Sequence, residues 1–204
     1  MLALNLLWIA ALKLNTNNFN LKKYLYLPIM LGLLLAGNSH AIEPPPLLTD
    51  YLPRVKNFGQ GQFTYLGFKV YDASFYAEDP AGQTGFALSL NYLRKISSND
   101  LVSSTVKQLE RVGASEEQIG QWKKPLEKIY PDVESGHQIM AVFIPKKGTS
   151  FLHNGKPVGN IAGDDFAKSF FGIWLDPKTS YPELRRQLLV NPCSPALINS
   201  NCSK

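Results

Sequence analysis

The sequence is poor in the residues on which many classes of protein function depend. Its 204 residues include only two cysteines and three histidines. One histidine lies close to the N-terminus, and neither His137 nor His153 is spaced with the cysteines as zinc ligands would be. The only candidate phosphate loop, Gly59-Gln60-Gly61, lacks the strand-to-helix context that such a loop needs. The sequence therefore predicts no metal site and no cofactor, and it identifies no catalytic residue.

Acidic residues are absent from the first 41 positions, where three lysines carry the only charge. A basic pair precedes an apolar run at 24–37, and the small residues Ser39 and Ala41 follow it. This order predicts a signal peptide at 1–41 and a periplasmic or secreted protein. The apolar run is shorter than the roughly 20 residues of an ordinary membrane span. An uncleaved membrane anchor is the alternative.

The chain also lacks a strong excess of one charge. It holds 21 basic and 16 acidic residues; three lysines and no acid lie in 1–41, so the remainder carries a net charge of +2. This excess is too small and too scattered to indicate nucleic-acid binding. We expect no stable membrane span once the leader is removed.

Both cysteines lie in the C-terminal tail at 193–204, which is rich in proline, asparagine and serine. In an exported protein this pair predicts a disulfide between Cys193 and Cys202. The intervening residues, 42–192, are long enough for one domain with its own hydrophobic core.

Hydrophobic periodicity within that domain predicts both strands and helices, an α+β fold. The three consecutive prolines at 44–46 predict an extended N-terminal segment, and Gly59-Gln60-Gly61 predicts a bend. Asn154-Gly155 indicates a tight hairpin turn. The predicted strands lie at 57–77 (one long or bulged pair), 86–96 and three times within 137–161; the predicted helices lie at 98–113, 115–129, 164–176 and 180–189, with capping boxes at Ser115/Gln118 and Ser180/Glu183.

The strand at 86–96 alternates with a period of two. Phe86, Leu88, Leu90, Tyr92 and Arg94 share the face that we expect to look inward. A tyrosine and an arginine at the end of an apolar face could hold a carboxylate or a phenolate through charge-assisted hydrogen bonds. The alternative is a tyrosine bonded to backbone and an arginine at the solvent edge.

The stretch F-A-K-S-F-F-G-I-W-L at 166–175 spreads its apolar side chains over a wide arc of a helix. It is too short to span a membrane. We expect this helix to lie deeply against a sheet, with its aromatic face in the core rather than lining a ligand site.

Three stretches together resemble the chalcone isomerase-like family, specifically its exported bacterial branch. They are G-F-K-V-Y-D-A-S-F-Y at 67–76, L-N-Y-L-R-K-I at 90–96 and F-F-G-I-W-L-D-P-K-T-S-Y-P-E-L-R-R-Q-L-L at 170–189. The resemblance implies an open-faced β-sandwich, in which an antiparallel sheet carries helices on one face and a ligand cleft lies between them. In this family, plant enzymes close a chalcone to a flavanone, and non-catalytic members bind fatty acids with an arginine and a tyrosine.

The positions that carry chemistry in the plant enzymes differ in this sequence. The region that matches their active-site arginine, 59–62, has no arginine, and the position of their late threonine or serine is Ile173. The position of their active-site threonine is Tyr71, the residue type of the fatty-acid-binding members. The resemblance therefore favours Tyr71, with Tyr92 and Arg94, as ligand-binding residues.

Three functional hypotheses follow. The first is an exported binder of a small apolar or aromatic acid or a fatty acid. The second is an intramolecular lyase or isomerase acting on a chalcone-like or enolisable substrate. The third is a cell-envelope interaction module whose cleft is filled by Phe166, Phe170 and Trp174.

Overall fold

The computed structural model describes residues 45–189 and 194–199. All of them belong to one compact unit, residues 42–204. The predicted leader at 1–41 and the predicted disulfide partners Cys193 and Cys202 lie outside the described residues.

Six antiparallel strands form a single sheet in the order in which they follow one another along the chain. The predicted antiparallel sheet is confirmed, with a long first strand pair that contains two register shifts. Asn154 and Gly155 both have positive φ, 49° and 77°, as the predicted two-residue hairpin turn requires. The strands are β1 (Lys56–Tyr65), β2 (Phe68–Ala77), β3 (Phe86–Tyr92), β4 (Gln138–Ile144), β5 (Gly148–His153) and β6 (Lys156–Ile161).

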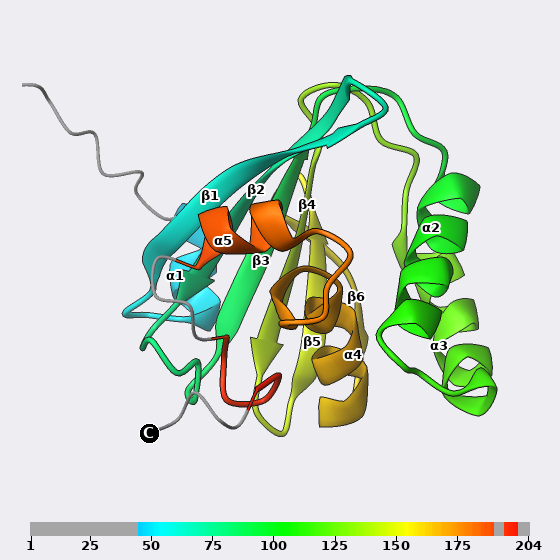
Figure 1. The fold of residues 1–204 in the computed structure, drawn as a ribbon. Helices are drawn as coiled ribbons and strands as arrows, with labels where there is room; N and C mark the ends of the chain where they lie inside the picture. Colours follow the sequence, from blue (N-terminus) through cyan, green and yellow to red (C-terminus); the bar gives the residue numbers. More distant parts are fainter. Residues whose placement is uncertain (1–44, 190–193, 200–204) are drawn as a thin grey trace, which may run out of the picture. The chain divides into compact units, whose positions relative to one another are not determined.

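Four helices cover one face of the sheet (Figure 1). They are α2 (Ser98–Arg111), α3 (Glu116–Ile129), α4 (Asp164–Leu175) and α5 (Pro182–Leu188). Helix α5 packs on β1 and β2, α4 packs on β5, and α3 contacts β6. The predicted capping box of α3 is present, because Ser115 and Gln118 bond each other's backbone N–H groups. The α+β fold with helices layered on the sheet is thus confirmed.

The aromatic face of α4 forms the centre of the main core. Phe166, Phe170 and Phe171 are almost completely buried, and Phe166 also contacts Trp122 of α3 at a ring-centroid distance of 5.4 Å. Phe171 meets Phe86 of β3 edge to face at 4.8 Å. The expectation that the stretch 166–175 lies deeply against a sheet is confirmed.

A smaller core lies on the opposite face of the sheet. Because side chains alternate along a strand, Ala87 points away from Phe86. It packs with Leu48 of a short helix and with Leu52, the residue that follows this helix. This helix, α1 (Pro46–Tyr51), corrects the prediction of an extended segment. Pro46 is the first helical residue, where a missing N–H breaks no intrahelical bond and the fixed φ of proline suits the helix.

The segment Gly59-Gln60-Gly61 is part of β1, so the predicted bend is wrong. A Cβ on Gly59 would lie 2.4 Å from the backbone oxygens of Gln187 and Leu188, and one on Gly61 would meet the side chain of Gln187. The two glycines therefore allow the end of α5 to approach the strand closely.

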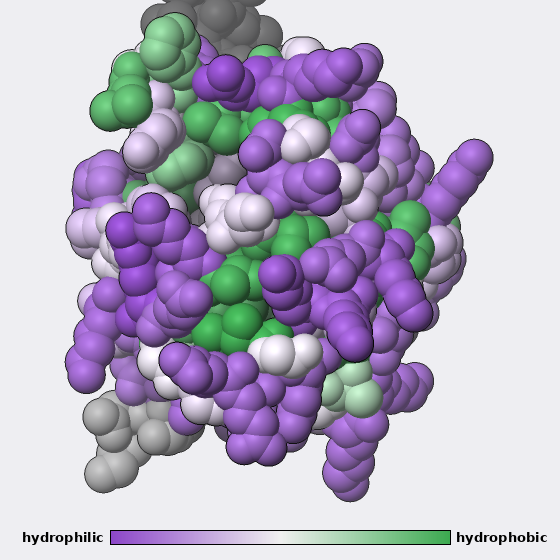
Figure 2. All heavy atoms as spheres, turned by 90° about the vertical axis from the view of Figure 1, so that its right-hand side faces the viewer, coloured by the Kyte–Doolittle hydropathy of each residue, from purple (hydrophilic) through white to green (hydrophobic). Residues whose placement is uncertain are grey.

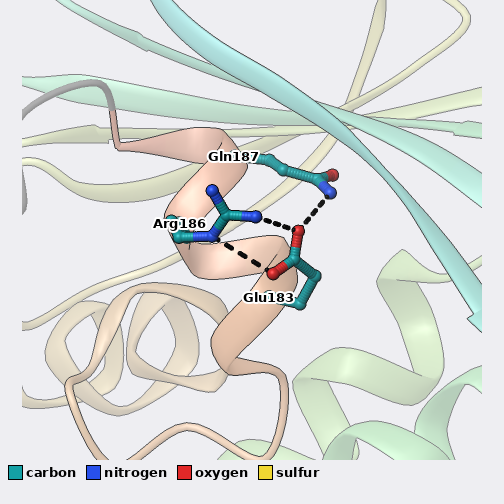
Figure 3. A network of polar contacts seen from close by, with 3 residues as sticks. All are labelled: Glu183, Arg186 and Gln187. Atoms are coloured by element: carbon teal, nitrogen blue, oxygen red, sulfur yellow. Dashed lines mark hydrogen bonds and ion pairs between the residues drawn. The ribbon is translucent and has the colours of Figure 1, made fainter.

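The predicted capping box at the start of α5 is absent. Tyr181, not Ser180, is the residue before the helix, and no side chain caps it. Glu183 instead accepts hydrogen bonds from Arg186 and Gln187 one turn further on (Figure 3). Because this cluster is exposed, it contributes little to the free energy of unfolding.

The apolar segments of these elements are short. Within 45–189 and 194–199, no helix combines the length and the apolar character of a membrane span.

Replacement of Gly59 by alanine tests the contact between α5 and β1. We expect Gly59→Ala to lower the free energy of unfolding by roughly 1–3 kcal/mol, because the new methyl group overlaps backbone atoms of α5. Gly120→Ala is the matched control, since a Cβ at this exposed position of α3 meets nothing within 4 Å. It should raise the free energy of unfolding by about 0.5–1 kcal/mol. Urea denaturation measures both; equal stability of Gly59→Ala and wild type would disprove the contact.

Candidate functional site

A cavity of about 120 Å³ lies between the sheet and helices α2 and α4. Its apolar wall includes Phe63, Val70, Leu90, Ile96, Leu101 and Ile173. Four tyrosines, Trp174 and the side chains of Thr105 and Gln108 supply polar atoms. For comparison, a cavity of about 150 Å³ admits benzene, and pockets for whole drug-sized ligands run from about 300 Å³ upward. The cavity therefore fits one aromatic ring or a short stretch of hydrocarbon chain.

Trp174 connects α4 to the sheet at the floor of this cavity. Its indole N–H donates to the hydroxyl oxygen of Tyr71 on β2 at 2.9 Å. The end of α4 is held in place by the segment that follows it, because the carbonyl of Leu175 accepts from Arg185 Nε at 2.9 Å and from the hydroxyl of Ser194. The bond to Tyr71 thus fixes the indole directly, and the bonds to the carbonyl of Leu175 fix the end of the helix that carries it.

The hydroxyl of Tyr92 has a different environment. Tyr92 stands opposite Tyr71 in the β2–β3 register, with ring centroids 5.9 Å apart. The residue is only 4% exposed, yet its hydroxyl forms no hydrogen bond with any residue that the structure describes. By contrast, the hydroxyl of Tyr130 accepts from Thr105 Oγ1 at 3.3 Å. The oxygen is not one of the fully buried unpaired atoms, so it keeps accessible surface in the cavity. A hydroxyl that faces the cavity and has no protein partner makes Tyr92 the group best placed to bond a ligand.

Burial raises the pKa of Tyr71, Tyr92 and Tyr130 above the ordinary value of tyrosine. For Tyr71, the hydrogen bond from Trp174 lowers the pKa by less than burial raises it. All three phenols are therefore protonated at neutral pH. Each hydroxyl therefore keeps a proton that it can donate to a ligand, and none is available as a base.

The cavity contains no basic side chain. Asp100 is the only formally charged residue among those that line it, and its carboxylate accepts from the hydroxyl of Ser97 at 2.6 Å. An ionised carboxylate placed deep in this cavity would meet no cation and would lose its hydration. The interior therefore favours an uncharged group.

Of the three ligand-binding residues predicted from the sequence, the structure brings Tyr71 and Tyr92 together in the cavity. Arg94 is not among the lining residues. Strand β3 ends at Tyr92, and Arg94 is exposed with its guanidinium carbon 5.8 Å from the centre of the Phe68 ring. The segment that carries Arg94 adjoins the cavity wall, because the N–H of the preceding Leu93 bonds the carbonyl of Val70, a lining residue.

Sequence reasoning did not identify Trp174, Tyr130, Thr105 or Gln108 as lining residues. Trp174 belongs to a helix face that is otherwise core, and nothing local distinguishes it from Phe170 one turn earlier. Tyr130 follows the end of α3 and reaches the cavity only because α3 packs beside α2. Phe166 and Phe170 do not fill the cavity.

Neither histidine of the described part contributes to this site. His137 and His153 contact each other, with Nδ1 and Nε2 3.4 Å apart. In the described part of the chain, no three His, Cys, Asp or Glu side chains gather as metal ligands would.

Removal of a single hydroxyl group should have different effects on the free energy of unfolding at Tyr71 and at Tyr92. Tyr71→Phe leaves the buried indole N–H of Trp174 without an acceptor, and we expect a loss of about 1–3 kcal/mol in the free energy of unfolding. Tyr92→Phe removes a hydroxyl that has no protein partner and should leave stability within about 0.5 kcal/mol of wild type. Chemical denaturation of the two variants makes the comparison, and equal losses would show that the bond between Trp174 and Tyr71 contributes nothing specific.

Comparison with known proteins identifies relatives of this architecture. A protein of Haemophilus influenzae, described only as uncharacterized, is 24% identical over 134 residues, which are 64% of this chain and 66% of that protein. The chain thus spans just under two thirds of the length of this relative. A fatty-acid binding protein of Arabidopsis thaliana has a similar fold, with a TM-score of 0.53 at 15% identity over 71% of this chain and 90% of that one.

Residues 58–190 match the family model described as chalcone isomerase-like. The matched range begins in β1, ends just after α5, and includes every element that contributes a residue to the cavity. The chain belongs to the chalcone isomerase-like family.

Proposed function

We propose that this chain binds a small, largely apolar molecule in the cavity between its sheet and helices α2 and α4. One observation carries the proposal: the hydroxyl of Tyr92 opens onto an apolar cavity and has no partner among the described residues. A ligand with a hydrogen-bonding group would pair this hydroxyl and place its hydrocarbon part against Leu90, Leu101 and Ile173. The solved neighbour from Arabidopsis thaliana, which is a fatty-acid binding protein, supports a binding role.

The charge and size of the cavity restrict the ligand. The buried part should be an aromatic ring or a short alkyl segment, since the cavity measures about 120 Å³. If the ligand is an aromatic or fatty acid, its carboxylate belongs at the rim, where Arg94 is exposed, and not beside Asp100. Arg94 then acts on the charged end of the ligand, while Tyr71 and Tyr92 act on the buried end.

An isomerase is the second candidate. Tyr71 and Tyr92 are protonated donors, and such donors could stabilise the oxyanion of a developing enolate. The cavity offers no cation to assist them. Conversion of a chalcone that disappears in Tyr92→Phe would favour this candidate over binding alone.

We further propose that the protein acts outside the cytoplasm. The order of basic pair, apolar run and small residues at 22–41 supports export. Intact-mass analysis of the protein purified from cells should give a chain that begins at Ile42, with a mass that increases on reduction of a Cys193–Cys202 disulfide. A chain that retains residues 1–41 would instead support the uncleaved anchor.

A plug at the cavity mouth tests the binding proposal. Both Ser103 and Ser104 are exposed on α2, but only Ser104 lines the cavity. We expect Ser104→Phe to fill the mouth and to lower ligand affinity at least about tenfold, the equivalent of losing one well-packed apolar contact. Ser103→Phe, the matched control, should bind as wild type does.

Binding is measured in two ways. Native mass spectrometry reports molecules retained by the purified protein. Titration with medium-chain alcohols, fatty acids and phenols follows the fluorescence of Trp122 and Trp174, the two tryptophans of residues 42–204. Equal binding by Ser104→Phe and Ser103→Phe would place the ligand elsewhere. Protein that is empty after purification and does not respond to any of these probes would end the proposal.

A further inference from the structure

The most exposed apolar side chains of the described residues gather at the tip of the β1–β2 hairpin. Tyr65 is 63% exposed, Leu66 79% and Phe68 66%. In the described part of the chain, the other exposed large apolar side chains are Leu47 and Val158, at 47% and 37%. Hydrophobic atoms protrude at the upper left of Figure 2, at the height at which Figure 1 shows this hairpin. Three neighbouring side chains of this size in water are a cost to the folded protein unless something covers them.

The backbone conformation of the turn is unfavourable for a leucine at position 66. Leu66 and Gly67 are the two central residues of the turn, with φ of 49° and 81°. A two-residue hairpin turn with positive φ at both positions prefers Asn-Gly, and a branched side chain there is disfavoured. The β5–β6 hairpin of the same chain has Asn154-Gly155 at the equivalent positions.

No packing contact within the protein offsets the backbone strain at Leu66. It is the most exposed of the large apolar residues, and even a Cβ added to the adjacent Gly67 would meet no atom within 4 Å. A residue that breaks a local rule with no compensating contact inside the protein indicates a function outside it.

Three basic side chains lie on the segments that adjoin the apolar tip. Lys69 follows Phe68 and is exposed, as are Arg94 and Lys95 of the adjoining loop. The guanidinium of Arg94 lies over the Phe68 ring at 5.8 Å. The segments 63–71 and 93–97 contain these three cations and no acid. Acids come next to them: Asp72 accepts from Gln62, and Asp132 and Glu134 flank Val133, which pairs with Ile96.

We propose that this tip, formed by Tyr65, Leu66 and Phe68, inserts into the surface of a lipid bilayer. Apolar side chains that penetrate to the boundary of headgroups and acyl chains, with basic residues at the level of the phosphates, are the general pattern of interfacial binding. A protruding turn of three side chains suits this partner. A specific protein interface needs about 800 Å² on each side, more than a narrow turn presents.

This placement also brings the cavity close to the membrane. Phe63 and Val70 line the cavity, and each lies two residues from an inserting side chain on the same strand. A membrane-derived apolar ligand would thus have a short path into the site. Insertion itself does not depend on that proposal, since no tip residue lines the cavity.

The experiment is flotation of residues 42–204, the unit that contains the whole described fold, with vesicles of phosphatidylcholine alone or mixed with phosphatidylglycerol. Wild type should float with both and more strongly with the anionic vesicles. Leu66→Asn/Phe68→Thr should weaken binding at least about tenfold. Leu66→Asn alone should weaken binding while its melting temperature equals or exceeds that of wild type, because asparagine suits the turn. Val158→Thr, the control on β6, should bind as wild type.

Two results would overturn the inference. One is a wild type that ignores both kinds of vesicle, or tip variants that bind as it does. The other is a dimer in gel filtration that Leu66→Asn dissociates without any vesicle binding, which would assign the tip to a protein contact. If the protein retains a ligand but does not bind vesicles, membrane insertion is disproved and the proposed ligand binding stands. If the protein binds vesicles but retains no ligand and responds to none of the probes, only the proposed ligand binding is disproved.

Discussion

The fold depends on burying the aromatic face of α4. Phe166, Phe170, Phe171 and Trp174 are each less than 10% exposed, and burial of side chains of this size contributes about 1.5–3 kcal/mol each. Their sum is of the same order as the entire stability of a typical domain, about 5–15 kcal/mol. The helix therefore cannot leave the sheet while the protein stays folded. Around α4 pack the sheet, α3 and α5.

The cavity is a consequence of this constraint at the end of α4. The last turn carries Trp174 and is fixed by bonds from Arg185 and Ser194 to the carbonyl of Leu175. The indole is also tied to Tyr71, so it cannot turn to fill the space in front of Tyr92. Helix α2 closes the other side with Leu101 but places the small side chains of Ser104 and Thr105 at the mouth. Because Trp174 is fixed on one side and the side chains of α2 at the mouth are small, the space between them can hold an aromatic ring.

Most of the fold follows from local signals in the sequence. Strand alternation, the Asn154-Gly155 turn and the capping box of α3 act within a few residues, and a sequence shows such signals directly. Features set by distant contacts were missed. Gly59 and Gly61 look like a bend until α5 is seen against them, and the bond from Trp174 to Tyr71 joins residues 103 positions apart. The place of Arg94 could not be predicted either, because it depends on where β3 ends and on the exposed ring of Phe68.

The distribution of charge around the cavity connects the site to the hairpin tip. The interior holds protonated phenols, and the exposed carboxylate of Asp100 lies at its edge. The basic residues Lys69, Arg94 and Lys95 lie at the end of the sheet that carries the exposed tip. A molecule with an apolar body and an anionic head would satisfy both regions only with its body inward and its head outward. In that orientation the head would stay at the level of the lipid phosphates, while the body would turn from the bilayer into the protein. Leu66 occupies a turn position where asparagine would be more stable. If the tip binds a bilayer as proposed, the backbone strain at Leu66 is offset by the burial of its side chain in that surface.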